Sequence, residues 1–166
     1  IRNDGLFHGP GDQQLLADAE QRLGVTLPPS YRAFVIASNG WLASTSKIIP
    51  LQRVQAFGQA DPQYVQEWSL EPPGGIPDER YFVYGDAQEP YNIRSAYLPG
   101  CLLISEPLLE VNERLLLNPR VRFDNQELEA WFMTPRIAGA VRYRSFTELM
   151  QFMKMSDEAL WRRLTA

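Results

Sequence analysis

Residues 15–40 restrict the fold of this chain more than any other stretch, because their pattern predicts two short helices joined by a tight corner. Leu15, Ala19 and Leu23 recur at one-turn spacing, which is typical of the buried stripe of an amphipathic helix. Gly24 adopts a left-handed conformation at low cost, so the first helix is expected to end there.

The second helix of this hairpin is expected to begin at the proline pair 28–29, because proline at the first helical position gives up no useful backbone donor. Tyr31, Phe34 and Val35 fall on one face, and the Asn-Gly pair at 39–40 provides the stop. The pattern predicts a helical hairpin that covers another part of the fold, and by itself it indicates no chemistry.

The length and composition of the chain favour one domain with an ordered core. It has 166 residues, of which 45% are hydrophobic. We expect an N-terminal arm over residues 1–11 and a single domain over residues 12–166. No run approaches the roughly 18 apolar residues of a membrane-spanning helix, and a lone cysteine, Cys101, allows no internal disulfide. These features favour a cytoplasmic protein without membrane contact.

Beyond the hairpin, short aliphatic or aromatic stretches alternate with Pro, Asn and Gly residues, a pattern typical of strands. The expected strands are residues 48–49, 81–84, 101–105, 114–117, 129–133 and 142–144, with 109–112 as a further candidate. Ser145 and Glu148 have the spacing of a capping box and Ser156 is a second helix-start residue, so two C-terminal helices are expected. The order predicts an α+β fold, in which an antiparallel-rich twisted sheet packs with the N-terminal hairpin and the C-terminal helices.

The side chains that usually carry catalysis are scarce in this sequence. His8 is the only histidine and lies in the expected arm, which leaves a catalytic triad or a histidine–cysteine metal site unsupported. Glu127 and Glu129 alternate around Leu128, so we expect both carboxylates on one solvated face of a strand. The sequence therefore predicts no catalytic residue, no metal site and no cofactor, and the chain is expected not to be an enzyme.

The middle of the chain is strongly acidic. Residues 60–113 contain ten acidic residues against two arginines, a net charge of −8, whereas the whole chain carries −4. This charge disfavours nucleic acid and favours a basic protein partner, although a merely solvated surface is the alternative. Tryptophans on loops are also candidate interface residues, because a few aromatic side chains often dominate binding energy. The candidate partner-binding residues are Trp41, Glu67, Trp68, Glu71, Asp78, Glu79, Asp86 and Glu89.

Several short motifs follow one another in a distinctive order along residues 12–155. They are Ala19-Glu20, Leu23-Gly24, Leu27-Pro28, Tyr31, Asn39-Gly40, Ile49-Pro50-Leu51, an aromatic run at 81–84 ending in Gly85-Asp86, and Ser-Phe-Thr-Glu-Leu at 145–149. In order and spacing they resemble the Smi1/Knr4 domain of the SUKH superfamily, of the bacterial immunity-protein type. The chain departs from that pattern at Ala87, where similar domains often have a second glycine, and in a long insert-like stretch over residues 61–80.

The resemblance implies an α+β domain that binds proteins and needs no catalytic residues. Its bacterial members imply an immunity protein that binds and neutralises a cognate toxin, and a basic nuclease would suit the acidic segment. Its eukaryotic members imply an alternative, a regulatory scaffold that binds host proteins of cell-wall or signalling networks. A third and less favoured hypothesis is a carboxylate-based enzyme or ligand-binding domain in which Asp86, Glu89 and Arg94 share a cleft. The sequence leaves the oligomeric state open.

Overall fold

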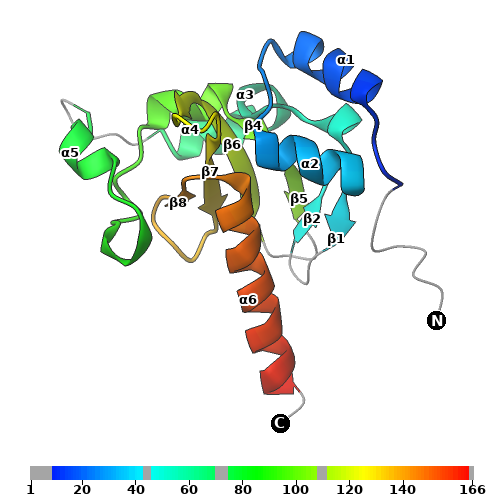
Figure 1. Cartoon of the computed structure of the whole chain (residues 1–166). Helices are drawn as coiled ribbons and strands as arrows, with labels where there is room; N and C mark the ends of the chain where they lie inside the picture. The colour runs from blue at the N-terminus through cyan, green and yellow to red at the C-terminus, as the bar shows by residue number, and fades with distance from the viewer. Residues whose placement is uncertain (1–8, 43–45, 70–74, 108–111, 165–166) are drawn as a thin grey trace.

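The computed structural model describes residues 9–42, 46–69, 75–107 and 112–164, with a five-stranded antiparallel sheet at the centre (Figure 1). Its strand order is β3-β4-β6-β7-β8. These strands are β3 (Gln55–Ala56), β4 (Leu102–Leu103), β6 (Arg114–Arg122), β7 (Leu128–Met133) and β8 (Val141–Tyr143). A smaller antiparallel sheet has the order β1-β2-β5, with β1 (Trp41–Leu42), β2 (Ser46–Ile48) and β5 (Ser105–Pro107).

The two sheets are joined through Ile104, which lies between β4 and β5. Its backbone amide donates to the carbonyl of Leu115, and its own carbonyl accepts from the amide of Ile49, each at 3.0 Å. One extended segment therefore takes part in both sheets, which explains why the sequence at 101–105 has the continuous apolar pattern of a buried strand.

Helices cover both faces of the five-stranded sheet, and the sheet separates two hydrophobic clusters. Alternation along β7 shows the division: Leu128, Ala130 and Phe132 belong to the first cluster, whereas Trp131 and Met133 belong to the second. The first cluster includes residues of α1 (Gln13–Leu23), α2 (Pro29–Ala37) and α6 (Phe146–Leu164). The second includes residues of α3 (Phe57–Ala60), α4 (Pro62–Glu67), α5 (Asp78–Tyr81) and the 3-10 turn η3 (Ser95–Gly100). Two further 3-10 turns are η1 (Leu51–Arg53) and η2 (Gly85–Ala87).

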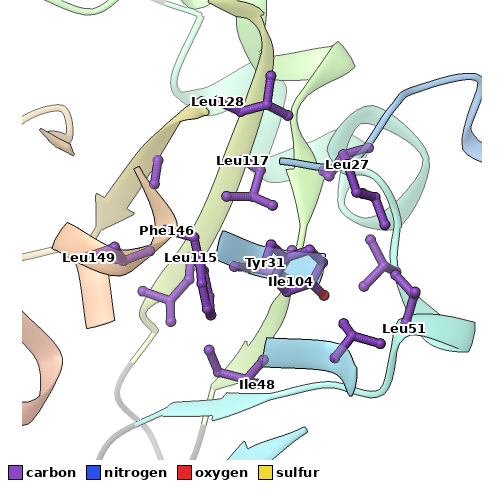
Figure 2. Packing of buried hydrophobic residues seen from close by; sticks show 14 of the residues in the cluster. Leu27, Tyr31, Ile48, Leu51, Ile104, Leu115, Leu117, Leu128, Phe146 and Leu149 are labelled. Atoms are coloured by element: carbon purple, nitrogen blue, oxygen red, sulfur yellow. The ribbon is translucent and has the colours of Figure 1, made fainter. Parts of the chain in front are cut away.

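The predicted helical hairpin is confirmed, and it forms one wall of the first cluster. Gly24 ends α1 with a φ of +65°, and α2 begins at Pro29. Leu27 and Tyr31 are buried, and Figure 2 shows both within the packed cluster, with Tyr31 near Phe146 of α6. The rings of Tyr31 and Phe146 meet edge to face with their centroids 5.0 Å apart. The corner between the two helices thus positions the C-terminal helix.

The strand predicted over residues 81–84 is wrong. Residues 78–81 form the short helix α5, and the chain then turns through η2, where Gly85 has a φ of +70°. Pro77 precedes α5 and two acidic residues occupy its first turn, both of which favour a helix start over a strand. The aromatic composition of this stretch reflects burial of Tyr81 against the second cluster rather than strand pairing.

The two C-terminal helices expected at residues 145–166 are one helix, α6, which runs from the sheet past the rest of the molecule (Figure 1). The capping box at its start is confirmed: the Glu148 amide donates to Ser145 Oγ at 3.1 Å, and the Glu148 carboxylate accepts from the Arg144 amide at 2.8 Å. Ser156 lies inside the helix because no glycine or proline interrupts residues 146–164.

Some expectations fall outside the described residues, namely His8, most of the arm over residues 1–11, and most of the candidate strand 109–112. Gly9 and Gly11, at the end of the expected arm, bond to Asn39 and Val35 near the end of α2. The boundary between arm and domain stays a prediction. Within the described part of the chain, no helix has both the length and the apolarity to cross a membrane.

Alanine substitution at two glycines tests whether backbone conformation or available space determines how much an added side chain destabilises the fold. A Cβ at Gly24 or at Gly100 would meet no atom within 4 Å, but only Gly24 has a left-handed φ. We expect Gly24→Ala to lower the free energy of unfolding by about 1 kcal/mol, whereas Gly100→Ala leaves it unchanged or raises it by roughly 0.5 kcal/mol. Urea unfolding of both variants measures the difference, and equal effects would contradict the assignment.

Candidate functional site

Most of the predicted partner-binding residues lie on one run of short helices and turns, from α4 to η2, over the second cluster. Glu67 is the last residue of α4, and Trp68 caps that helix. Asp78 and Glu79 occupy the first turn of α5, and Asp86 lies in η2. All four of these carboxylates are exposed, and Trp68 is half-buried.

Contacts connect Glu89 to α5 and to the residues that follow it. The Glu89 carboxylate lies 3.8 Å from the Arg80 guanidinium of α5 and accepts a hydrogen bond from Asn92 Nδ2 at 3.0 Å. The neighbouring Tyr91 hydroxyl holds the pKa of Glu89 below its ordinary value, and Glu89 in turn raises the pKa of Tyr91. Glu89 is therefore fixed at the surface beside an aromatic ring.

Trp41 does not join this group. Trp41 lies in β1 and packs against the first cluster, whereas Trp68 packs against the second, so the five-stranded sheet separates the two indoles. Glu71 lies outside the described residues. A binding role for either residue stays a prediction.

The sequence reasoning missed two exposed aromatic residues of the same run. Phe82 is 43% exposed and Tyr91 is 56% exposed. Phe82 was expected to be buried in a strand. Tyr91 stands alone in the polar run Gln-Glu-Pro-Tyr-Asn, and this isolation was the available signal. We define the acidic–aromatic surface as Glu67, Trp68, Asp78, Glu79, Phe82, Asp86, Glu89 and Tyr91.

A buried carboxylate on β7 holds this run against the sheet. Glu129 is fully buried, and its Oε2 accepts from Tyr81 Oη at 2.6 Å, from Trp131 Nε1 at 2.7 Å and from Asn118 Nδ2 at 2.8 Å. Its Oε1 accepts from Tyr84 Oη at 2.8 Å. The two tyrosines come from α5 and the turn after it, so one carboxylate fixes both ends of the segment that carries Phe82.

Arg142 of β8 completes the network from the neighbouring strand. Its guanidinium is fully buried, lies 3.4 Å from Glu129 Oε1, and donates to the backbone carbonyls of Tyr81 and Val83. The Gln88 side chain accepts from the Arg142 amide at 2.7 Å and donates to the Arg142 carbonyl at 3.2 Å. The Gln88 side chain thus hydrogen-bonds to the backbone at the edge of β8, as the backbone of a further strand would.

The solvated face expected for Glu127 and Glu129 is wrong. Glu127 is 8% exposed and accepts from the Ser30 amide and hydroxyl at 2.9 and 2.7 Å, where it caps a helix that has no side-chain cap of its own. Glu129 faces the second cluster with Trp131, because residues two apart on a strand share a face. Glu127 precedes β7 and bonds to α2 of the first cluster, so the two carboxylates do not share a face as expected, and both faces of this sheet are covered.

Three other acids of the acidic middle that the structure describes stabilise the fold. Asp61 caps α4 and lies 3.0 Å from the Arg114 guanidinium, Glu106 pairs with Lys47 and Arg53, and Glu113 accepts from Ser46. The net charge of −8 over residues 60–113 is therefore not one continuous patch. The exposed acids of this segment that the structure describes are those included in the acidic–aromatic surface.

Comparison with protein families agrees with this architecture. The model of the SMI1/KNR4 family (SUKH-1) matches residues 10–151. The chain belongs to the SMI1/KNR4 family. Membership indicates a protein-binding domain of immunity type in general terms. Comparisons with curated proteins and with solved structures found no match.

The SMI1/KNR4 family is generally non-enzymatic. Cys101 is buried, and burial raises the pKa of its thiol well above the ordinary value, which disfavours the reactive thiolate. Among residues 9–42, 46–69, 75–107 and 112–164, no group of three or more His, Cys, Asp or Glu side chains could hold a metal ion. Glu129 has its lone pairs occupied by fixed donors and no access to solvent.

The buried pair of the SMI1/KNR4 domain gives a stability prediction. Glu129→Gln leaves the Arg142 guanidinium without its counter-charge, so we expect the free energy of unfolding to fall by about 3–5 kcal/mol. Adding Arg142→Met should recover part of this loss, because the double variant no longer buries a lone charge. Urea unfolding measures both. As a control, Lys154→Gln in the exposed Lys154–Glu158 pair should cost less than about 0.5 kcal/mol.

The tyrosines of the network predict a loss of stability at high pH. Burial, followed by the neighbouring Glu129 carboxylate, raises the pKa values of Tyr81 and Tyr84 far above their ordinary value. The unfolded chain releases these protons near pH 10 while the folded chain keeps them, so their contribution is complete below about pH 10 and is lost above it. The urea midpoint of unfolding should fall as the pH rises from about 8 to about 11, and it should fall less steeply in Tyr84→Phe. An equal slope in that variant would contradict the assignment.

Proposed function

We propose that this SMI1/KNR4 domain is a non-enzymatic immunity protein that binds a cognate bacterial toxin and neutralises it by covering its functional surface. The observation that carries the proposal is the acidic–aromatic surface, where exposed rings and carboxylates lie on short helices and turns. The buried Glu129 and Arg142 side chains hold the Tyr81 segment of this surface in place. Family membership supports protein binding in general, and the toxin is our specific proposal.

A fixed surface suits a binder that acts by occupancy alone. Holding α5 and η2 rigid before binding reduces the conformational entropy that association costs. Aromatic side chains with exposed faces supply most of the energy in interfaces of about 800 Å² per partner. No bond needs to be made or broken for such a protein to neutralise an enzyme.

The charges of this surface favour a basic toxin. Glu67, Glu79 and Asp86 are exposed and have no ion-pair partner among the described residues, and Glu89 has only the distant Arg80. Such charges accelerate association with a basic protein and repel nucleic acid. A nuclease whose basic surface binds nucleic acid matches this chemistry, and the cytoplasm, where such a toxin would act, is the proposed site of neutralisation.

Affinity capture tests the proposal directly. The immobilised chain is exposed to a lysate of its source cells at low and high salt, and bound proteins are identified. A dominant, salt-sensitive partner that arrests growth when expressed alone, and is tolerated when this chain is co-expressed, is the expected result. Several weak partners without toxicity would contradict the immunity proposal and favour the regulatory scaffold.

Charge reversal on the acidic–aromatic surface should slow the encounter with that partner. Glu67→Lys with Glu79→Lys is expected to lower the association rate constant by roughly tenfold at low salt and to flatten its salt dependence. The matched control is Asp18→Lys with Asp124→Lys, an equal change at exposed acids of α1 and of the β6–β7 turn. Stopped-flow measurement gives the association rate constant of each double variant, and an equal decrease in both would contradict a localised binding surface.

A further inference from the structure

A small apolar pocket opens beside the acidic–aromatic surface. It has a volume of about 150 Å³ and is lined by Trp68, Tyr91, Ile93, Ala138 and Gly139. An engineered cavity of about this volume holds one benzene molecule, so the pocket has room for one side chain.

The walls of the pocket are fixed before any partner arrives. The amide of Ala140 donates to the carbonyl of Pro90 at 2.9 Å, which ties the loop after β7 to the turn that carries Tyr91. Gly139 has a φ of +115°, and a Cβ there would lie 1.9 Å from the Pro90 carbonyl oxygen, so only glycine permits this approach.

The indole of the pocket is also held in place. The Trp68 ring stacks on Tyr64 with centroids 5.7 Å apart and an angle of 14° between the planes. The Arg114 guanidinium lies 5.1 Å from the Tyr64 centroid and pairs with Asp61, which caps the same helix. Trp68 therefore loses little rotamer freedom when a partner binds, which is the property of an effective interface residue.

The chemistry around this pocket favours a cation with an apolar stem. Tyr91 and Trp68 line the pocket with aromatic rings, and the faces of such rings attract cations. Glu89 is the main cause that raises the pKa of Tyr91, so this aromatic wall has a carboxylate beside it, and Glu67 is the last residue of α4, directly before Trp68 in the sequence. The Arg80 guanidinium, 3.8 Å from Glu89 and more than half exposed, neutralises this charge only in part.

Arginine matches the site better than lysine does. Its planar guanidinium is weakly hydrated, stacks on aromatic rings and binds carboxylates through two parallel hydrogen bonds. The chain itself uses this preference at Tyr81, where the guanidinium carbons of Arg142 and Arg94 lie 4.3 and 4.5 Å from the ring centroid.

We propose that this pocket receives one arginine side chain from a basic loop of the partner protein, with its methylene stem against Trp68 and Ile93 and its guanidinium between Tyr91 and Glu89. This inference rests on the proposed function and names the partner residue that the acidic–aromatic surface recognises. The pocket is the central contact, and the surrounding acids steer the encounter.

A titration with capped amino acids tests the pocket without the partner. N-acetyl-arginine-N-methylamide is added to the isotope-labelled chain, and the Trp68 indole N–H signal, assigned by its loss in Trp68→Phe, is followed by NMR. We expect a saturable shift, with the citrulline analogue binding roughly fivefold more weakly because it has the same shape but no charge. Equal or tighter binding of the leucine or glutamate analogue, or no binding of any probe, would overturn the proposal.

Two exposed aromatic residues give matched variants for the same titration. Tyr91→Ala removes a wall of the pocket and should abolish saturable binding of the arginine probe, whereas Phe82→Ala, outside the lining, should leave it unchanged. Glu89→Gln should weaken the probe several-fold, with Asp124→Asn as its control. Equal effects of Tyr91→Ala and Phe82→Ala would overturn the assignment to this pocket.

The captured toxin then separates failure of the pocket from failure of the function. If Tyr91→Ala lowers toxin affinity by at least roughly tenfold and Phe82→Ala does not, the pocket is the central contact. If toxin is neutralised equally well by Tyr91→Ala, the pocket proposal is wrong while the immunity function stands. Absence of any toxin would overturn the function, and with it the assignment of the pocket to a toxin arginine.

Discussion

The buried Glu129–Arg142 pair is the interaction on which the exposed part of this fold depends. Residues 75–100 contain no strand of either sheet and only short helices and turns, so they have no ladder of backbone hydrogen bonds to hold them. Glu129 supplies acceptors for Tyr81 and Tyr84, and Arg142 supplies donors for two backbone carbonyls of the same segment. Removing either charge leaves the other buried, which is why the pair has to be kept or replaced together.

Arginines elsewhere in the chain hold irregular backbone in the same way. The sequence has fourteen arginines and two lysines. Arg22 donates to the carbonyls of Leu51 and Val54 around η1, and Arg94 donates twice to the carbonyl of Ile76 before α5. A guanidinium has five donors in a fixed plane and can satisfy several carbonyls at once, which an ammonium group cannot do with the same geometry. The arginine excess is thus in part a structural requirement.

The acidic residues of the segment 60–113 fall into two groups, one that stabilises the fold and one that is exposed to a partner. Asp61, Glu106 and Glu113 are paired or bonded within the fold. Glu67, Glu79 and Asp86 are exposed, and these are the carboxylates available to a partner. A rigid scaffold with apolar rings and free acids on one run of turns is suited to recognition.

Local rules in the sequence determined the helical hairpin, the capping box at Ser145 and the antiparallel α+β class, because caps, turns and periodicity act over a few residues. Charge and loop position in the sequence also selected Glu67, Trp68 and Asp78 as candidate binding residues, and that role stays a prediction. Only the tertiary structure decided that Glu129 is buried, because its partner Tyr81 lies 48 residues away. The exposure of Phe82 and Tyr91 also depends on distant residues, because contacts from β7 and β8 hold residues 78–91 in a short helix and turns instead of a strand. A side chain's face follows from local alternation, but what covers that face is set by distant segments.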